Sequence, residues 1–173
     1  MVTTSPTKHP PLVAIIMGSK SDAAVMYSSK QILDLLEIPC ECRIISAHRS
    51  PHELAEFVQN APRQGIEVFI AGAGASAALP GAIAAHTIMP VIGVPLNATA
   101  LQGIDALLAI AQMPAGVPVA CMAIGDAGAK NASLMAARIL ALKNDVIRQR
   151  LSNYYAKMKT AAQETSLGDP FLT

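Results

Sequence analysis

The residues best suited to chemistry lie in a short segment between an apolar run and a proline that can open a helix. His48 and Arg49 stand side by side there, with Ser46 before them and Pro51 after them. An imidazole exchanges a proton near neutral pH, and a guanidinium offers a fixed fork of donors to a phosphate. A lone loop histidine is more often merely solvated, but the pairing with arginine favours an acid–base and anion-binding site.

A second segment, Gly18-Ser19-Lys20-Ser21-Asp22, follows the first apolar run. Free backbone N–H groups, two hydroxyls and a helix N-terminus favour a phosphate there. Ser21 and Asp22 could equally serve only as helix caps. The segment is not a Walker loop, because GxxxxGK[ST] is missing, and the sequence leaves both interpretations open.

Other candidate segments and histidines offer weaker indications of a catalytic or binding role. Residues 71–76 are rich in Gly and Ala, so the backbone can approach a ligand closely. His86 lies in an apolar stretch and is expected to be a packed or interface histidine, whereas His9 and His52 are expected to be solvated. The sequence contains no HExxH, Cys/His cluster or Ser-His-Asp arrangement, so metal and acyl-enzyme chemistry have no support.

The candidate segments follow short apolar runs, which alternate along the chain with helical stretches. The runs are nearly continuous in apolar character, which is typical of strands buried on both faces. Five strand–helix units in succession predict a three-layer, doubly wound α/β fold of flavodoxin-like type, with a parallel sheet of strand order 2-1-3-4-5. The candidate segments then share the carboxyl edge of the sheet. We expect strands at 12–17, 42–45, 68–71, 91–94 and 117–122, helices at 22–36, 51–64, 79–88, 103–112 and 127–143, and an extra C-terminal helix at 145–163.

Composition indicates a single domain with more apolar surface than it can bury. The 173 residues weigh 18.0 kDa, 52% of them are hydrophobic and 14% charged, and the mean hydropathy is +0.40. Helices 79–88 and 103–112 have no polar face, so a homo-oligomer is expected, with an oversized monomeric core as the alternative. We expect a flexible N-terminal tail at 1–11, one domain at 12–165 and a C-terminal tail at 166–173.

Several classes of protein are excluded or disfavoured. No apolar run reaches about 18 residues, so a membrane-spanning helix is not expected. A net charge of +1 and an aromatic content of 3% disfavour nucleic-acid binding and a flavin sandwich. Cys40, Cys42 and Cys121 lack CxxC spacing and are expected to be reduced, buried thiols of a cytoplasmic protein, the first two pointing to opposite faces of a strand.

Taken together, the motifs resemble the class I family of N5-carboxyaminoimidazole ribonucleotide mutases (PurE), which act in de novo purine synthesis. The resemblance runs in order from about residue 13 to residue 140, and GSxSD, SAHR and QMPxGxPV in combination are far more specific than any one alone. The matching segments are GSKSD at 18–22, SAHRSP at 46–51, AGAG at 71–74, LPG at 79–81, PVIGVP at 90–95, LQGIDALLAIAQMPAGVPV at 101–119, AIG at 123–125 and GAKNASLMAARIL at 128–140.

The resemblance implies an octameric, cytoplasmic enzyme without metal or organic cofactor, which moves a carboxylate from N5 of an imidazole ribonucleotide to ring carbon C4. His48 would be the general acid and base. The ribose phosphate and its hydroxyls would be held by the serines and Asp22 of the first segment and by Arg49, and the carboxylate pocket would be lined by the residues after the third strand. The implied substrate-binding residues are Ser19, Ser21, Asp22, Ser46, Arg49, Gly72, Ala73, Gly74, Ser76 and Leu79.

One departure from the family pattern concerns the pocket. The family reads GGAAHLPG where this chain has Ala78 before Leu79, and His86 lies about 12 Å further along a helix, too far to replace the missing histidine. Three alternatives therefore stay open: a carboxylase that joins CO2 directly to aminoimidazole ribonucleotide, a catalytically impaired nucleotide-binding homologue, and a flavin carrier on the same fold, which the scarcity of aromatics disfavours.

Overall fold

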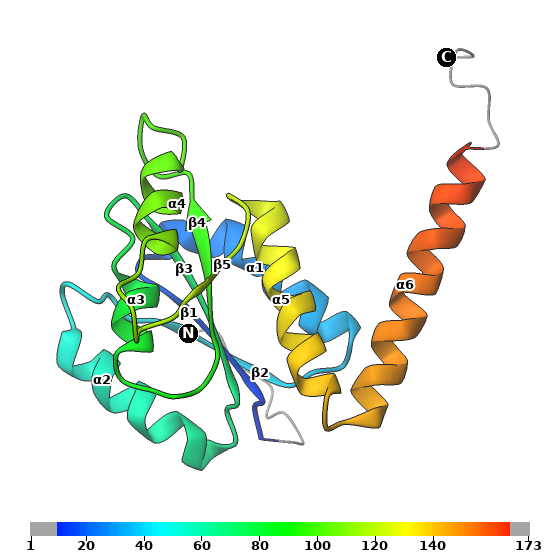
Figure 1. The fold of residues 1–173 in the computed structure, drawn as a ribbon, viewed down its shortest axis with the longest axis horizontal. Helices are drawn as coiled ribbons and strands as arrows, with labels where there is room; N and C mark the ends of the chain where they lie inside the picture. Colours follow the sequence, from blue (N-terminus) through cyan, green and yellow to red (C-terminus); the bar gives the residue numbers. More distant parts are fainter. Residues whose placement is uncertain (1–9, 167–173) are drawn as a thin grey trace.

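A five-stranded, all-parallel sheet forms the centre of the computed structural model, which describes residues 10–166 (Figure 1). The strand order is β2-β1-β3-β4-β5, which confirms the order predicted from the sequence. All five carboxyl ends therefore point to one edge. The strands are β1 (Val13–Met17), β2 (Cys40–Ile44), β3 (Val68–Gly74), β4 (Val91–Leu96) and β5 (Ala120–Cys121).

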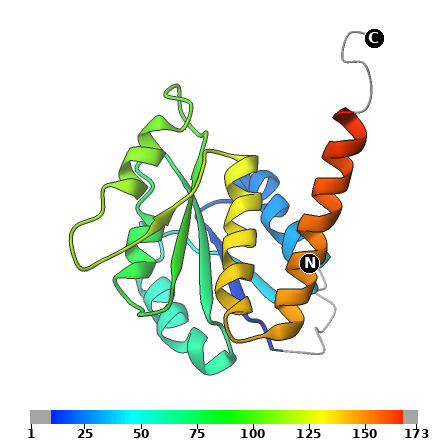
Figure 2. The same cartoon turned by 45° about the vertical axis from the view of Figure 1, so that its right-hand side comes forward.

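Helices cover both faces of the sheet and complete the three layers (Figures 1 and 2). The helices on one face are α1 (Ala23–Leu35) and α5 (Asp126–Ala141), and those on the other are α2 (Pro51–Asn60), α3 (Leu79–Ala84) and α4 (Ile104–Ala111). Short 3-10 turns occupy Lys20–Asp22 before α1 and Ala61–Gln64 after α2. The last helix, α6 (Asp145–Ser166), begins beside α5 and extends away from the sheet, three residues further than expected.

Alternation along the central strands divides the core in two. In β1, Val13 and Ile15 face α1 and α5, whereas Ala14 and Ile16 face α2, α3 and α4, and all four are fully buried. Burial on both faces explains the continuous apolar runs of β1, β3 and β4.

The two edge strands differ from the prediction. We expected β2 and β5 to be buried on both faces, but β2 is half-buried to exposed along its length. The fifth strand has two residues instead of six and pairs with β4 only through Ala120 and Cys121. An edge strand has a neighbour on one side only, so its side chains are less covered than those of a central strand.

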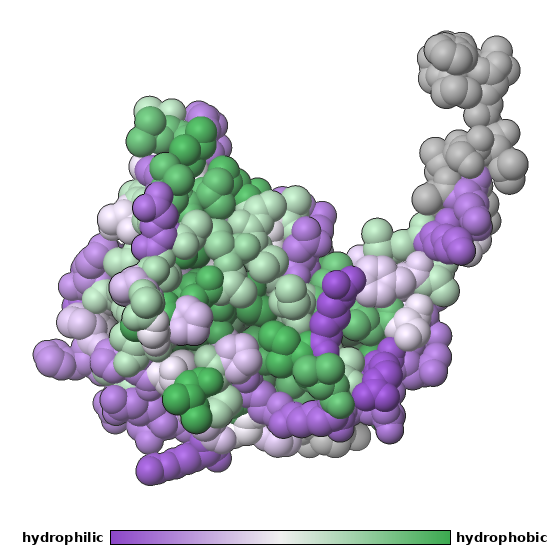
Figure 3. All heavy atoms as spheres, viewed as in Figure 1, coloured by the Kyte–Doolittle hydropathy of each residue, from purple (hydrophilic) through white to green (hydrophobic). Residues whose placement is uncertain are grey.

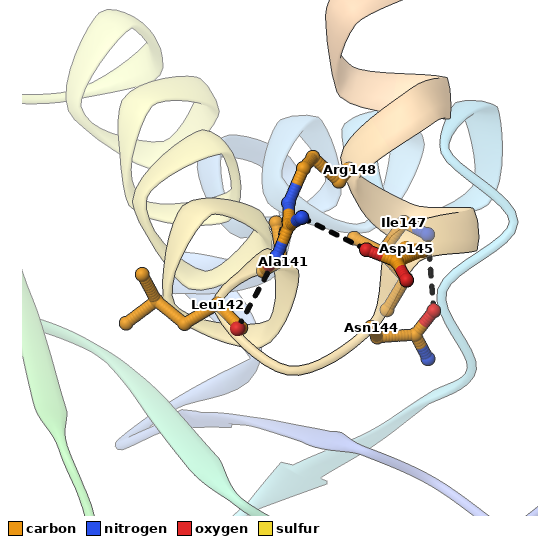
Figure 4. A network of polar contacts seen from close by, with 6 residues as sticks. All are labelled: Ala141, Leu142, Asn144, Asp145, Ile147 and Arg148. Carbon is orange, nitrogen blue, oxygen red and sulfur yellow. Dashed lines mark hydrogen bonds and ion pairs between the residues drawn. The ribbon is translucent and has the colours of Figure 1, made fainter.

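Residues at the start of α6 bind the free carbonyl groups at the end of α5 (Figure 4). The Arg148 guanidinium donates to the Ala141 carbonyl at 2.8 Å and to the Leu142 carbonyl at 3.3 Å, and pairs with Asp145 at 2.8 Å. The Asn144 side chain caps α6 by accepting the Ile147 N–H at 3.1 Å. A cation at a helix C-terminus also interacts favourably with the helix dipole, so this junction fixes the direction in which α6 leaves.

The two apolar helices are only partly buried within one chain. Helix α3 ends at Ala84, four residues earlier than expected, and Ile88 beyond it is 97% exposed. In α4, Ile104 and Leu108 are 56% and 51% exposed, and Leu101 just before the helix is 62% exposed. Apolar side chains gather over this helix in Figure 3. This exposure is what the sequence predicts for helices that one chain alone cannot bury, and it disagrees with the alternative of an oversized monomeric core. The oligomer itself stays a prediction.

No helix between residues 10 and 166 is long and apolar enough to cross a membrane. The tails expected at 1–11 and 166–173 lie outside the described residues, apart from Pro10, Pro11 and Ser166. Ser166 is the last residue of α6.

Candidate active site

A pocket of about 290 Å3 lies at the carboxyl edge of the sheet, where the turns after β1, β2 and β3 meet. Segments that are about 30 residues apart in the chain are adjacent here, because β1 lies between β2 and β3. The lining residues are Gly18, Ser19, Ser21, Asp22, Ser46, Ala47, His48, Ala73, Gly74, Ala75, Ser76, Ala77, Ala78, Leu79 and Ala98.

The turn after β1 is ordered by its own side chains. Asp22 accepts the Ser19 N–H at 3.0 Å, and the Ser19 hydroxyl accepts the Ser21 N–H at 3.3 Å, which together form a capping box. The Ser21 hydroxyl donates to the Ser19 hydroxyl at 3.0 Å. Asp22 therefore takes part in a cap as expected, but the capping hydroxyl belongs to Ser19 and not to Ser21. The same three residues also line the pocket, where oxygen lone pairs remain available to a ligand.

The turn after β2 carries the imidazole. His48 is exposed and lines the pocket, and Pro51 follows as the first residue of α2. The Arg49 N–H donates to the Ser46 hydroxyl at 3.3 Å, and the Arg49 guanidinium donates to the Gly18 carbonyl at 3.0 Å. Arg49 therefore stands beside the cavity, and not in its lining, and connects this turn with the one after β1.

Glycines at the end of β3 allow the backbone to form the pocket wall. A Cβ at Gly72 would lie 2.4 Å from the Met26 sulfur, and a Cβ at Gly74 would lie 2.5 Å from the Ala98 Cβ. Gly72 does not line the cavity but packs on Met26 beneath it, whereas Ala73 and Gly74 do line it. Side chains larger than hydrogen at these two glycines would displace their neighbours.

The loop from β3 to α3 has an unusual backbone. Ala75 and Ala77 have φ values of 53° and 43°, in the left-handed region where side chains are disfavoured. Ser76 and Leu79 line the pocket as the sequence predicts, and Ala78 lines it at the position of the family histidine. The loop therefore combines a strained backbone with a wall of small side chains.

Some residues were missed and others were misplaced by sequence reasoning. Ala98, in the turn after β4, lines the pocket, yet its methyl group gives no chemical signal in a sequence. His86 is exposed in the turn after α3 and is not packed within this chain, and His52 is exposed on α2 as expected, while His9 is outside the described residues. Between residues 10 and 166, no three His, Cys, Asp or Glu side chains are grouped to hold a metal ion.

The sheet order and this pocket define a flavodoxin-like α/β protein with a small-molecule site at the carboxyl edge of the sheet. The family described as AIR carboxylase matches residues 12–161, and the chain belongs to that family.

Relatives from two domains of life agree with this assignment. The N5-carboxyaminoimidazole ribonucleotide mutase of Pyrococcus horikoshii is 51% identical over 154 residues, which cover 89% of this chain and 86% of that protein. The mutase of Escherichia coli is 49% identical over 150 residues, covering 87% and 89%. Among solved structures, Treponema denticola PurE superposes with a TM-score of 0.80 at 29% identity, covering 94% of this chain and 99% of that one.

Proposed function

We propose that the chain is an isomerase of de novo purine synthesis, which converts N5-carboxyaminoimidazole ribonucleotide to 4-carboxy-5-aminoimidazole ribonucleotide. The observation that carries the proposal is the pocket in which the His48 turn meets the hydroxyls of the GSKSD turn. The mutases of Pyrococcus horikoshii and Escherichia coli, each about half identical over most of both chains, support the same reaction.

The proposed reaction uses one imidazole twice. His48 gives a proton to N5 as the N5–CO2 bond breaks, which leaves aminoimidazole ribonucleotide and CO2 in the pocket. The ring carbon C4 then attacks CO2, and His48 takes the C4 proton back as the ring regains its aromaticity. The proton is returned, no electron is transferred, and the proposal needs neither metal nor organic cofactor. The pocket must hold CO2 away from water between the two steps.

Substrate contacts are proposed for two groups of residues. Ser19, Ser21, Asp22 and Ser46 surround the ribose phosphate and its hydroxyls, and Arg49 contributes charge from beside the cavity. Ala73, Gly74, Ser76 and Leu79 line the side toward which the carboxylate would move, with Gly72 behind them.

A second candidate function is direct carboxylation of aminoimidazole ribonucleotide. The description of the matching family, AIR carboxylase, names that activity. Loss of the family histidine at Ala78 suggests a third candidate, a homologue that binds the nucleotide without turnover. In both alternatives the ligand would occupy the same pocket, so affinity alone cannot distinguish them from the mutase.

The assembly and compartment belong to the same proposal. We propose that residues 12–165 act as one domain in a homo-octamer. The exposed Ile104 and Leu108 of α4 and Leu101 just before it supply apolar surface for subunit contacts. Sedimentation of the purified chain measures this directly. A cytoplasmic location is consistent with three cysteines that form no disulfide among the described residues.

The experiment that distinguishes the candidates compares substrates. The purified protein is incubated with N5-carboxyaminoimidazole ribonucleotide in one assay, and with aminoimidazole ribonucleotide plus bicarbonate in another. Product formation is followed by absorbance in both assays. The mutase predicts rapid turnover of the first, whereas a carboxylase would need the second. The variant Ala78→His should leave the mutase rate unchanged or raise it, and a large loss would mean that the pocket has been rebuilt around the small side chain.

A further inference from the structure

A pair of thiols lies on the exposed edge of the sheet, outside the pocket. Cys40 and Cys42 are two residues apart on β2, and residues at that spacing in a strand point to the same face. They stand opposite Val13 and Ile15 of β1, which face α1 and α5, and Cys40 packs against the same core. The expectation that the two thiols point to opposite faces is therefore wrong.

The environment makes the two thiols unequal. Their effect on each other lowers the pKa of Cys42 and raises the pKa of Cys40. The Lys30 ammonium on α1 favours the thiolate form of both cysteines. Asp34, which forms an ion pair with Lys30 at 2.5 Å, disfavours both thiolates, and Glu41 disfavours that of Cys42. Cys42 is exposed and Cys40 is half-buried, so Cys42 is the thiol that a reagent in solution reaches first.

We propose that Cys42 is a site of thiol–disulfide exchange, at which a small-molecule disulfide is reduced and a Cys40–Cys42 bridge forms. The Cys42 thiolate attacks one sulfur of the disulfide, the S–S bond breaks, and one thiolate leaves and takes up a proton. Cys40, after losing its proton to solvent, then attacks the Cys42 sulfur and displaces the second thiolate. The two cysteines lose two electrons and two protons, and the disulfide gains them as two thiols.

Strand geometry sets the character of this bridge. Two residues of a strand span about 6.6 Å at Cα, at the upper end of the range that a disulfide accepts, and their parallel side chains keep the Cβ atoms farther apart than the separation of about 3.5–4.5 Å that it needs. The edge strand β2 must therefore bend at Glu41 when the bridge forms. The bridge is therefore strained and easily reduced, which is the property of regulatory and not of structural disulfides. Such a reversible bridge suits a compartment in which thiols are normally reduced.

Cys121 provides a matched control within the same sheet. It lies on the opposite edge strand, β5, and is half-buried like Cys40, with no second cysteine two residues away. Burial raises the pKa of its thiol, so it should react slowly.

The test treats the full chain with 5,5′-dithiobis(2-nitrobenzoic acid) and follows the released aromatic thiol and the protein mass. Wild type should show a phase about tenfold faster than the reaction of Cys121. In this phase each chain should release two equivalents of the aromatic thiol. The remaining protein should be two hydrogens lighter and should carry no mixed disulfide with the reagent. Cys121→Ser should keep this phase, and Cys42→Ser should lose it. Cys40→Ser and Cys40→Ala should still release the first equivalent of the aromatic thiol, but they should retain the mixed disulfide on Cys42.

Two results would overturn the proposal. A fast phase that survives in Cys42→Ser would place the reactive thiol elsewhere. A wild-type protein that retains the mixed disulfide would show that Cys40 does not complete the bridge. Circular dichroism of each variant establishes that it is folded, and dithiothreitol should restore the dithiol in wild type. Neither readout depends on enzymatic turnover, so the outcome is separate from that of the proposed function.

Discussion

The Arg49 guanidinium donates to the Gly18 carbonyl at 3.0 Å and so connects the turn after β2 with the turn after β1. The two turns approach each other because β1 and β2 are parallel neighbours, with Met17 opposite Ile44 at their carboxyl ends. The bond uses one of the five N–H donors of the guanidinium. Arg49 thereby fixes the relative position of the imidazole turn and the hydroxyl turn while donors remain for an anion.

Arg49→Ala should weaken substrate binding more than it slows the chemical step. Removing the charge and the Gly18 contact should raise the dissociation constant of aminoimidazole ribonucleotide about tenfold to a hundredfold, equivalent to about 1.4–3 kcal/mol. Isothermal titration calorimetry measures this. The control is Arg63→Ala, at an exposed position after α2 and outside the pocket lining. An unchanged dissociation constant in Arg49→Ala would remove Arg49 from the phosphate site.

Gly128→Ala should destabilise the fold, although alanine is normally the better helix former. Gly128 is buried in α5, and a Cβ there would lie 1.7 Å from the Ala123 carbonyl oxygen. The backbone must move to relieve this contact, and we expect a loss of at least about 2 kcal/mol in the free energy of unfolding. Urea denaturation monitored by circular dichroism gives the value. A variant as stable as wild type would contradict the close approach of residue 123 to α5.

Ala75→Gly should stabilise the loop that lines the pocket. Ala75 has a φ of 53°, a conformation that costs an L-residue with a side chain about 1 kcal/mol and costs glycine almost nothing. Glycine also increases the entropy of the unfolded chain, so the expected net gain is about 0.5 kcal/mol. Thermal unfolding tests this, with Ala82→Gly in α3 as a control that should lose stability. A lower melting temperature for Ala75→Gly would contradict the strain.

Asp126 should make stability depend on pH in the acidic range. Its hydrogen bond with Lys130, assisted by one from the Ser28 hydroxyl, lowers its pKa below the ordinary value of 3.8. The carboxylate therefore contributes stability above about pH 4, and this contribution is lost as pH falls through the lowered pKa.

The variant Asp126→Asn isolates that contribution. Melting temperatures of wild type and variant should differ at about pH 6 and converge toward about pH 2. Glu56→Gln, an exposed carboxylate on α2, is the control. A difference between wild type and Asp126→Asn that stays constant over this range would show that the carboxylate charge is not responsible.

The central part of the fold could be predicted because its strands are buried on both faces. Continuous apolar sequence at β1, β3 and β4 identifies them, and their alternation with helices predicts a parallel sheet. The number of strand–helix units, five, favours the flavodoxin-like order that the structure has. The edges could not be predicted equally well. Glu41 and Arg43 interrupt the apolar character of β2, and the apolar run that predicts β5 is longer than the two residues that pair. Only the finished sheet determines that each of these strands has one neighbour.

The pocket could be predicted only in part, because some of its residues have recognisable side-chain chemistry and others are placed by contacts between distant segments. Side chains with recognisable chemistry, such as those of His48 and Ser19, could be assigned to the carboxyl edge from the strand order alone. The placement of Gly72 behind the wall depends on its contact with Met26 of α1, and the contribution of Ala98 depends on its contact with Gly74. Such contacts between distant segments leave no pattern in the sequence.

The most direct test of the central claim is turnover of N5-carboxyaminoimidazole ribonucleotide by wild type and by His48→Asn, followed through product absorbance. We predict turnover by wild type and a loss of at least about a hundredfold in the variant, with ligand affinity nearly unchanged. His52→Asn, four residues further on and exposed on α2, should keep the wild-type rate. Full turnover in His48→Asn, or none in wild type that still binds the nucleotide, would contradict the account.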